Sequence, residues 1–399
     1  MYFPREIIVQ SEVVHHPITE KIIARSPESN VIVCDLPSVT PDDIILKQYS
    51  KLYSKALSVA ERRKISRKIM FLHKSDNIIA TMAAGSNPLK CCHNFKKITP
   101  YKAACLFNCE YCWFKDPDLM MRVNVAFFDH LNSINEVIWA SKDHDPVFTF
   151  THYKTDCLAI EHLTGFIKDL VDFFAKSNGY LILLTKSGIV QPLLGLQHNR
   201  HTIMQWSMNA PEFTRKYERG AGSLVARIRA AKRLRAENYP IVLRIDPIFA
   251  FDNWKAQYQL MIDTVFESVR PDHITLGIAR FQGPTEIQQI IDNGYGAHRS
   301  LLQSQNPHFV FAKLNASSGY QSSENPFENT MADMPYTYPD EFRYELLNNI
   351  ISRIKVHDPD ISIGICEETK EMWDELGLIY RNDKNLDCAC NYTGFQKAI

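Results

Sequence analysis

The stretch AACLFNCEYCWF, residues 103–114, places three cysteines within eight residues. Cys105, Cys109 and Cys112 follow the spacing C-x3-C-x2-C, with aromatic residues between and after them. Thiols this close in a chain without a secretion signal are more often metal ligands or catalytic groups than disulfides. The stretch also stands just ahead of a regular alternation of strand and helix patterns, so its position bears on the fold as well as on the chemistry.

The composition is typical of a globular protein. Of the 399 residues, 45% are hydrophobic and 23% charged, and 45 basic residues balance 45 acidic ones. A net charge of zero excludes a global attraction to nucleic acid, so any nucleic-acid contact requires a local patch. Because we find neither a secretory signal nor an apolar run of membrane-spanning length, we expect no membrane association. We expect a reducing compartment: the cytoplasm of a cell or, for a virus-encoded chain, that of its host.

From about residue 98 onward, short apolar runs alternate with helical patterns. Such alternation indicates βαβ units and a parallel sheet. About six units predict an α/β fold, a partial (β/α)6 TIM-type barrel with its active site at the carboxyl ends of the strands. Strands are predicted over 123–128, 146–152, 180–186, 202–209, 241–248 and 273–281, and helices over 158–176, 224–238 and 254–269.

We divide the chain into three regions: an N-terminal extension (1–97), the barrel (98–285) and a C-terminal region (286–399). The last is expected to hold a small α/β unit with a helix over 340–356, the strand ISIGIC and the helix TKEMWDEL. In the extension, the basic stretch ERRKISRKIMFLHK at 61–74 predicts either a solvated helix face or a phosphate-contacting patch.

Three explanations of the cysteine stretch stay open from the residues alone. A structural zinc needs four ligands, so it would require a distant fourth one here. Buried, inert thiols are the second explanation. The third is an iron–sulfur cluster, because three thiolates on a four-iron cluster leave one iron open to an external ligand.

With an aromatic residue directly before its last cysteine and βα units after it, the stretch resembles the radical S-adenosylmethionine (SAM) superfamily. This resemblance implies a [4Fe-4S] cluster held by Cys105, Cys109 and Cys112, with SAM on the open iron. It also implies cleavage of SAM to a 5′-deoxyadenosyl radical that abstracts hydrogen from a substrate. The electron would come from a partner such as flavodoxin or ferredoxin.

Further segments resemble, in order, those of the spore photoproduct lyases, which repair a methylene-bridged thymine dimer in DNA. The resemblance covers about residues 100–285. It is carried by TDCLAIEHLTGF at 155–166, LLTK at 183–186, WSMNAPEFTRKY at 206–217 and DPIFAFDNW at 246–254.

The resemblance implies SAM contacts at the strand ends. Tyr111 would pack against the cluster and SAM, and Thr155 with Asp156 matches a Ser-Asp pair of the family. Lys186 would reach the SAM carboxylate, and Ser207 would lie near the ribose. Plainer explanations also apply: Thr155 or Asp156 can cap the following helix, and Ser207 can be a satisfied core hydroxyl.

Three charged residues near the last strands are further candidates. Arg244 is either a partner of the SAM carboxylate inside the barrel or half of an outer salt bridge. Asp246 stands where the family usually has a small residue, so it is a candidate substrate contact. Arg280 is a candidate partner of a substrate phosphate or carboxylate.

Two positions depart from the lyases. The lyases keep a hydrogen-donating cysteine at the end of the second strand, where this chain has Tyr153. Cys157, four residues later, is expected to be a buried structural thiol. The lyases also have a tyrosine directly after the last cluster cysteine, where this chain has Trp113. Two explanations compete. In the first, which is our hypothesis, the product radical recovers hydrogen from 5′-deoxyadenosine, and the reaction is an isomerisation. In the second, Tyr153 replaces the cysteine as hydrogen donor.

The resemblance suggests a thymine-derived substrate, such as a hypermodified thymine of viral DNA that carries an amine or amino-acid arm. A base inside a duplex would have to be flipped out, at about a few kcal/mol. The candidate phosphate contacts are Arg62, Arg63, Lys64, Arg67 and Lys68.

The remaining cysteines include two short-spaced pairs. We hypothesise a second iron–sulfur cluster or a zinc site, against the alternative of scattered free thiols. Its ligands would come from Cys91 or Cys92 together with Cys366, Cys388 and Cys390.

The leading prediction is therefore a radical SAM enzyme, of isomerase or lyase type, that modifies or rearranges a thymine-type nucleotide in DNA. Lesion repair with a donor other than cysteine is the alternative, and a free nucleoside or another small molecule is another substrate to consider. A third hypothesis, from a different functional class, is that the protein is a non-catalytic DNA-binding relative of these enzymes.

Overall fold

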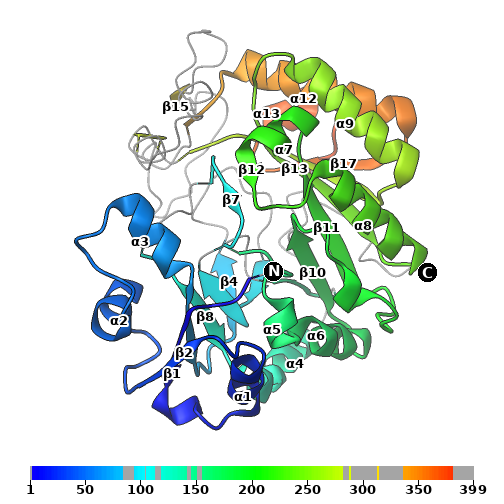
Figure 1. Ribbon diagram of the computed structural model, residues 1–399. Coiled ribbons are helices and arrows are strands. Elements are labelled where there is room, and N and C mark those ends of the chain that lie inside the picture. Colours follow the sequence, from blue (N-terminus) through cyan, green and yellow to red (C-terminus); the bar gives the residue numbers. More distant parts are fainter. Residues whose placement is uncertain are drawn as a thin grey trace, which may run out of the picture. The chain divides into compact units, whose positions relative to one another are not determined.

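The computed structural model describes residues 2–83, 94–103, 105–112, 118–141, 145–150, 155–281, 287–288, 312–313 and 336–380. The chain divides into two compact units (Figure 1). Unit 1 comprises residues 1–80, 96–108 and 114–202, and unit 2 comprises residues 81–95, 109–113 and 203–399. The predicted boundaries after residues 97 and 285 do not coincide with this division.

A five-stranded sheet in the order β2-β1-β3-β8-β6 forms one part of unit 1, parallel except for the β6–β8 pair. Its central strands are buried along their whole length, and Ile8, Phe71 and Met120 belong to one hydrophobic cluster. Burying each such side chain stabilises the fold by about 1.5–3 kcal/mol. The strands are β1 Glu6–Gln10, β2 Asn30–Cys34, β3 Ile69–His73, β6 Tyr101–Ala103 and β8 Met121–Asn124.

The basic stretch at 61–74 is not a single helix. Helix α3 (Val59–Ser66) begins with a capping box, in which Ser58 Oγ accepts from the Glu61 N–H and the Glu61 carboxylate accepts from the Ser58 N–H. The chain then turns into β3, because the residues IMFLH supply a run that is buried in the sheet. The expectation of one solvated helix face was therefore wrong for the second half of this stretch.

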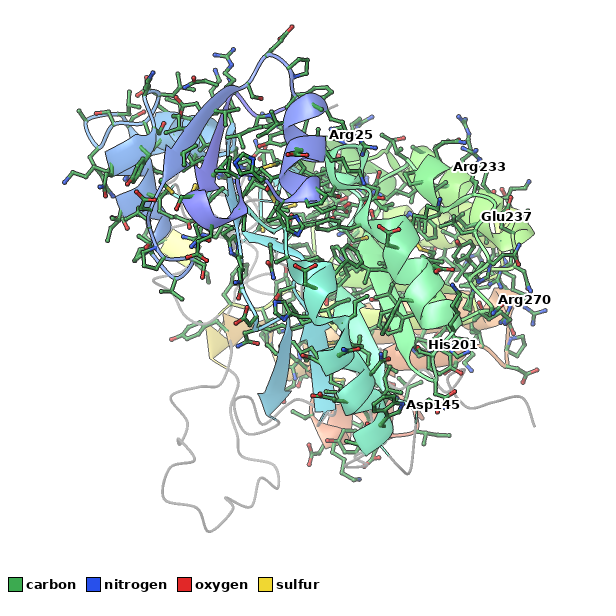
Figure 2. The ribbon with its side chains drawn as sticks, turned by 90° about the horizontal axis from the view of Figure 1, so that it is seen from below. Arg25, Asp145, His201, Arg233, Glu237 and Arg270 are labelled. Atoms are coloured by element: carbon green, nitrogen blue, oxygen red, sulfur yellow. The ribbon has the colours of Figure 1, made fainter. Side chains whose placement is uncertain are left out.

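Three parallel strands of unit 1, in the order β5-β9-β10, belong to a second, eight-stranded sheet. The predicted helix over 158–176 is divided at Gly165, whose φ of 69° ends α5 as a left-handed cap. Arg25 follows α1 and donates to the carbonyl oxygens of His162 at 3.3 Å and Leu163 at 3.1 Å (Figure 2). The elements are β5 Asn94–Ile98, β9 Val147–Phe150, β10 Tyr180–Thr185, α1 Pro17–Ala24, α2 Asp42–Tyr49, α4 Leu131–Ala140, α5 Glu161–Thr164 and α6 Phe166–Ala175.

Unit 2 is built on four parallel strands in the order β11-β13-β14-β17. The predicted strands and helices of this region are confirmed with small shifts at their ends. The elements are β11 Thr202–Met208, β13 Ile241–Ile248, β14 His273–Ile278, β17 Ser362–Ile365, α7 Pro211–Tyr217, α8 Leu224–Ala236, α9 Trp254–Ser268, α12 Asp340–His357 and α13 Lys370–Glu375. Short strands are β4 Ile79–Ala83, β7 Asn108–Cys109, β12 Glu218–Arg219, β15 Ala312–Lys313 and β16 Tyr336–Thr337.

The two faces of this parallel sheet differ in polarity. On one face, Leu243, Ile245 and Leu276 are buried, and α8 contacts β13 and lies beside α9 (Figure 1). Because side chains alternate along a strand, the paired residues Ser207 and Arg244 share the opposite face. The polar candidates Ser207 and Arg244 therefore stand on the more polar face of the sheet, where both are buried.

The exposed side of α8 carries charged residues near its end. Arg233 and Glu237 are exposed at the end of α8 (Figure 2). Among the described residues, no helix combines the length and the apolar character needed to cross a bilayer.

Candidate active site

The three cysteines of the loop form no disulfide among the described residues. Cys109 is buried, whereas Cys105 and Cys112 are partly exposed. The Cys112 N–H donates to the Cys109 carbonyl oxygen at 3.3 Å, which forms a turn between these two residues. Trp113 and Tyr153, the two positions that depart from the lyases, lie outside the described residues.

Helix α3 contacts the cysteine loop directly. Arg63 donates to Asn108 Oδ1 at 3.2 Å. Arg67 donates to the same oxygen and to the Phe107 carbonyl oxygen, both at 3.3 Å. These contacts fix the residues between the first two cysteines.

A second set of contacts lies beyond the cysteine loop. Asp118 accepts from Arg62 at 2.8 Å, from Tyr53 at 2.6 Å and from Lys55 at 2.9 Å. Arg62, Arg63 and Arg67 were expected to contact phosphate, but each has a partner within unit 1. The expectation failed because α3 lies next to the cysteine loop, so its arginines bond to protein atoms. The sequence alone does not show that the helix and the loop are neighbours.

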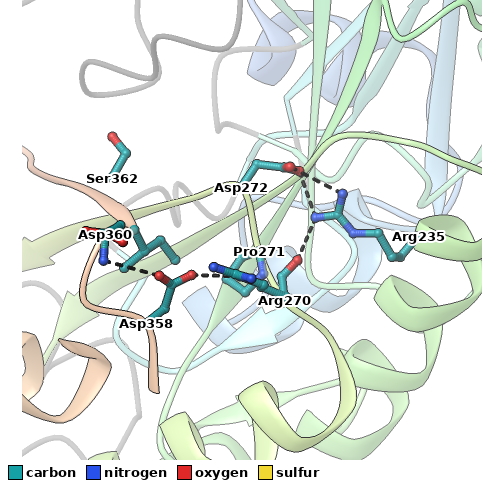
Figure 3. Close-up of a pocket in the computed structure, with 8 residues that line it drawn as sticks. Arg235, Arg270, Pro271, Asp272, Asp358, Asp360 and Ser362 are labelled. Carbon is teal, nitrogen blue, oxygen red and sulfur yellow. Dashed lines mark hydrogen bonds and ion pairs between the residues drawn. The ribbon is translucent and has the colours of Figure 1, made fainter. Parts of the chain in front are cut away.

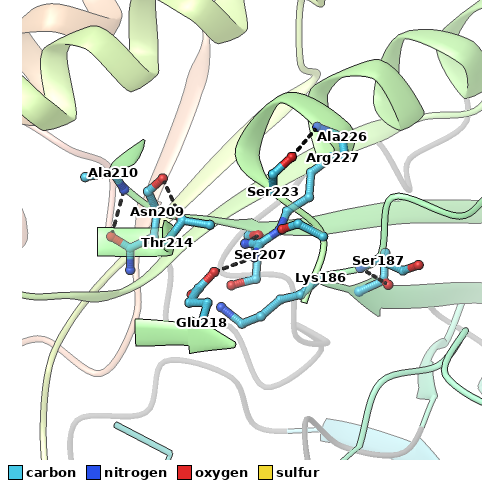
Figure 4. Close-up of polar contacts among 12 residues, drawn as sticks. Lys186, Ser187, Ser207, Asn209, Ala210, Thr214, Glu218, Ser223, Ala226 and Arg227 are labelled. Atoms are coloured by element: carbon cyan, nitrogen blue, oxygen red, sulfur yellow. Dashed lines mark hydrogen bonds and ion pairs between the residues drawn. The ribbon is translucent and has the colours of Figure 1, made fainter. Parts of the chain in front are cut away.

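Tyr111 belongs to a buried polar chain in unit 2. Its hydroxyl donates to Glu218, and the Glu218 carboxylate pairs with Arg227 at 2.5 Å. Arg227 also donates to the Ser207 carbonyl oxygen at 2.8 Å (Figure 4). Burial and the adjacent Glu218 raise the pKa of Tyr111 well above its ordinary value, so the phenol stays protonated.

Sequence reasoning missed Glu218 and Arg227. A signal for Arg227 exists: it lies at a helical spacing with Leu224, Ile228 and Ala231, which form the buried stripe of α8. A charged residue on an apolar stripe requires a buried partner. Nothing in the sequence identifies that partner as Glu218.

In unit 1, Asp156 organises the end of β10. Its carboxylate accepts from Thr185 Oγ1 at 3.0 and 2.9 Å, from the Lys186 N–H at 2.7 Å and from the Leu158 N–H at 3.0 Å. The N-cap of α5 is Ile160, so neither Thr155 nor Asp156 caps that helix. Asp156 instead fixes the backbone of Lys186, the proposed partner of the SAM carboxylate.

Cys157 is fully buried, as predicted. Burial and the neighbouring Asp156 raise the pKa of its thiol well above the ordinary value. A protonated thiol without solvent access behaves as a small hydrophobic side chain.

In unit 2, Arg244 pairs with Asp246 at 2.5 Å, and Ser207 Oγ donates to the Asp246 carbonyl oxygen at 3.3 Å. Arg280 pairs with Glu367, and both arginines donate to Cys366 Sγ. Of the five residues considered for a second metal site, the structure describes only Cys366. The other four, Cys91, Cys92, Cys388 and Cys390, lie outside the described residues.

A surface pocket of about 530 Å³ lies at the opposite, amino end of the strands (Figure 3). Its charges pair with one another: Arg235 with Asp272 at 2.7 Å and Arg270 with Asp358 at 2.8 Å. Because active sites of α/β barrels lie at the carboxyl ends of strands, this pocket is not the candidate site.

The donor set of the loop fits a four-iron cluster. The ligands of one zinc ion converge on a point, whereas three thiolates on a four-iron cluster each bind a different iron. Cysteine thiolates are the usual ligands of such clusters. Cys105, Cys109 and Cys112 would hold the cluster.

The parallel βα units and the three-cysteine loop are together typical of the radical SAM class of proteins. The profile of the spore photoproduct lyase family matches residues 93–325, more than half of the chain. The chain therefore belongs to the spore photoproduct lyase family. This confirms the predicted family.

Curated relatives agree with this assignment. The chain is 29% identical to the spore photoproduct lyase of Clostridium acetobutylicum over 169 residues, which cover 41% of this chain and 49% of that protein. It is 24% identical to the Bacillus subtilis enzyme over 257 residues, covering 61% and 72% of the two chains. The match thus spans about half the length of the Clostridium relative.

Solved structures show the same fold. A spore photoproduct lyase complexed with dinucleoside spore photoproduct superposes with a TM-score of 0.71 at 17% identity, covering 91% of this chain and 98% of that one. A mutant lyase with bound AdoMet and dinucleoside spore photoproduct gives a TM-score of 0.71 at 16% identity and the same coverage. The predicted α/β fold of the radical SAM type is confirmed.

Proposed function

We propose that the protein uses a [4Fe-4S] cluster and SAM to abstract hydrogen from a thymine-derived nucleotide in DNA, giving a modified or rearranged thymine. The observation that carries the proposal is the three-cysteine loop, which forms no disulfide among the described residues and contains a turn between Cys109 and Cys112. Arg63 and Arg67 bond to the residues between its first two cysteines. Family membership supports it, because one solved member of the family is a mutant lyase with bound AdoMet and dinucleoside spore photoproduct. When bound, the cluster and SAM supply a 5′-deoxyadenosyl radical.

The chain's own residues would bind and orient SAM. Lys186 would neutralise its carboxylate, with Asp156 fixing the Lys186 backbone and Thr155 beside it. Ser207 would contact the ribose, and Tyr111 would close the cluster loop through its bond to Glu218. Arg244 was a further candidate for the SAM carboxylate. Because it pairs with Asp246, we assign it to substrate binding instead.

The return of hydrogen separates two reactions. In the first, the product radical recovers hydrogen from 5′-deoxyadenosine, so SAM is regenerated and the substrate is isomerised. The changes at Trp113 and Tyr153 favour this reaction, because both positions of the lyases' hydrogen relay differ. Deuterated SAM tests it: label in the product supports it, and unlabelled product with stoichiometric 5′-deoxyadenosine rejects it.

The second candidate is repair of a thymine lesion with Tyr153 as the hydrogen donor. The substrate in the related structures, a dinucleoside spore photoproduct, favours it. Tyr153→Phe distinguishes the two reactions, because it would abolish repair and leave isomerisation intact. A free nucleoside is a further substrate to include in the assay.

The deciding experiment is anaerobic incubation of the reconstituted protein with SAM, a reductant and thymidine derivatives, in DNA and free. We expect substrate-dependent formation or turnover of 5′-deoxyadenosine and a product of unchanged mass. A product pair of intact thymines would instead indicate repair. Absence of SAM cleavage by the reduced protein would indicate a non-catalytic DNA-binding relative.

We also propose a one-electron donor of the flavodoxin or ferredoxin type and, as a separate hypothesis, a second cluster or zinc. The second site would use Cys91 or Cys92 with Cys366, Cys388 and Cys390. Iron analysis of anaerobically reconstituted protein tests it: about eight irons per chain support a second four-iron cluster, and about four reject it.

A further inference from the structure

The carboxyl ends of β13, β14 and β17 carry a polar cluster that the proposed hydrogen abstraction does not explain. Strand β13 contains one extra residue between Ile245 and Ile248 relative to β14. A bulge of this kind re-aims a side chain, and such bulges are over-represented beside active sites. Here it accompanies Asp246, whose carboxylate lies against Gly277.

Two guanidinium groups approach this carboxylate. Arg244 donates from Nη2 at 2.5 Å and from Nε at 3.0 Å to Asp246 Oδ2. Arg280 Nη2 lies 3.6 Å from the same oxygen. The three side chains thus present a donor, an acceptor and a donor within one small area.

The cluster is partly accessible and balanced in charge. The side chains of Arg244, Asp246 and Arg280 retain 8%, 13% and 19% of their exposure. Glu367 pairs with Arg280 and adopts a φ of 54°, which is unusual for a residue other than glycine. Backbone strain of this kind persists where surrounding structure enforces it, and it clusters at functional sites.

An array with two cations and two carboxylates does not favour a simple anion such as phosphate. It favours a neutral group whose polar edge alternates acceptor, donor and acceptor. The imide edge of thymine has this pattern, with O2 and O4 as acceptors on either side of N3–H. Cytosine differs, because it carries an amino donor in place of O4.

We propose that Arg244, Asp246 and Arg280 bind the imide edge of the substrate's thymine ring, with the arginines donating to its oxygens and Asp246 accepting from N3–H. The inference rests on the proposed function and names the part of the site that recognises the base. It also accounts for a carboxylate at a position where the family usually has a small residue. A buried polar site of this kind rejects an analogue that lacks the matching group, because its own polar atoms are then left unpaired.

The test measures binding rather than turnover. Full-length protein carrying its cluster and SAM is titrated with a thymidine dinucleotide, its N3-methyl counterpart and a deoxycytidine dinucleotide. We expect the wild type to prefer the thymidine ligand by at least about tenfold, the scale of one lost polar pairing. Asp246→Asn should abolish that preference, weakening thymidine binding while leaving the N3-methyl ligand almost unchanged.

Asp272→Asn is the matched control, since Asp272 also pairs with an arginine but stands at the other end of the strands. It should leave all three affinities unchanged. Equal affinity of the wild type for all three ligands, or an equal loss for all three in Asp246→Asn, overturns the inference. Failure of the proposed function is distinguished by a second readout: with every nucleotide, neither 5′-deoxyadenosine nor deuterium transfer between SAM and the nucleotide is detected.

Discussion

The Asp246 carboxylate occupies the space that a side chain at Gly277 would need. A Cβ on Gly277 would lie 2.6 Å from Asp246 Cγ and 2.7 and 2.9 Å from the two carboxylate oxygens. These distances are too short for non-bonded atoms, so the carboxylate must move if residue 277 carries a side chain. The absence of a side chain at Gly277 therefore leaves the space that the Asp246 carboxylate occupies.

Gly277→Ala should displace Asp246 without changing the charge of the site. We expect a loss of stability of about 1–3 kcal/mol from overpacking, and loss of the preference for the thymidine dinucleotide over its N3-methyl counterpart. Urea denaturation and calorimetric titration measure the two effects. Asp246→Ala removes the overlap but also the partner of Arg244, so it provides the background for comparison: Gly277→Ala should cost less stability in Asp246→Ala than in the wild type, while base preference stays lost. If Gly277→Ala kept the full preference for the thymidine dinucleotide, the close approach of Gly277 to the Asp246 carboxylate would not control base recognition.

Arg67 should control how well the cysteine loop accepts its cluster. Arg67→Ala removes the bonds to Asn108 and the Phe107 carbonyl oxygen, each worth about 1.5–3 kcal/mol as a bond to a charged group. We expect the iron content after reconstitution to fall well below that of the wild type. The electron paramagnetic resonance spectrum of the reduced cluster should broaden. Arg67→Lys should restore part of the loading.

Lys64→Ala is the control for this prediction, because Lys64 is exposed on the same helix. It should load iron normally. Wild-type iron content and an unchanged spectrum in Arg67→Ala would show that α3 does not support the loop. If DNA is bound, Lys64 is also the better place to test the salt dependence, since Arg62, Arg63 and Arg67 have protein partners.

The repeated βα pattern made the parallel strands of unit 2 predictable. The runs at 202–209 and 241–248 are long, apolar and bounded by polar turns, and they became β11 and β13 with ends shifted by at most one residue. The helix over 158–176 was predicted less well, because one glycine with a left-handed conformation divides an otherwise continuous helical pattern. The hydrophobic pattern continues across Gly165, so the sequence gives little indication that the helix ends there.

The candidate site was predictable where it is local in sequence and not where it is assembled from distant segments. The cysteine loop is recognisable from its own spacing. The bond from Tyr111 to Glu218 joins residues 107 positions apart, and that from Arg67 to Phe107 joins residues 40 positions apart. Long-range pairs of this kind depend on how elements pack, so a single sequence does not specify them.

Asp156 should support SAM binding through the backbone of Lys186. In Asp156→Asn, only one of the two terminal side-chain atoms can accept, so the amide cannot satisfy both the Lys186 N–H, which bonds Oδ2, and the Leu158 N–H, which bonds Oδ1. We expect a loss of about 1–3 kcal/mol in stability and about tenfold weaker SAM binding. Equilibrium dialysis with labelled SAM measures the second effect. Asp169→Asn, an exposed aspartate on α6, serves as the control. Unchanged SAM affinity in Asp156→Asn would remove Asp156 from the site.

Glu161, at the start of α5, should make unit 1 less stable as the pH rises. Burial raises the pKa of Glu161 from 4.5 to about 7, although its carboxylate accepts from the Ile167 N–H at 3.1 Å. Between these two values the folded state holds a proton that the unfolded state has released, so the free energy of unfolding falls with increasing pH and levels off above pH 7. A shift of this size corresponds to a loss on the order of 3 kcal/mol.

Glu161→Gln removes that titration and keeps an acceptor for the Ile167 N–H. Its free energy of unfolding should therefore lack the decline that the wild type shows between about pH 5 and pH 7. Urea denaturation at intervals across this range gives the comparison. Glu237→Gln, an exposed glutamate following α8, should reproduce the wild-type profile. Parallel profiles for wild type and Glu161→Gln would mean that the buried carboxyl does not take up its proton on folding. Its hydrogen bonds to Thr164 and Ile167 would then outweigh the cost of burying its charge.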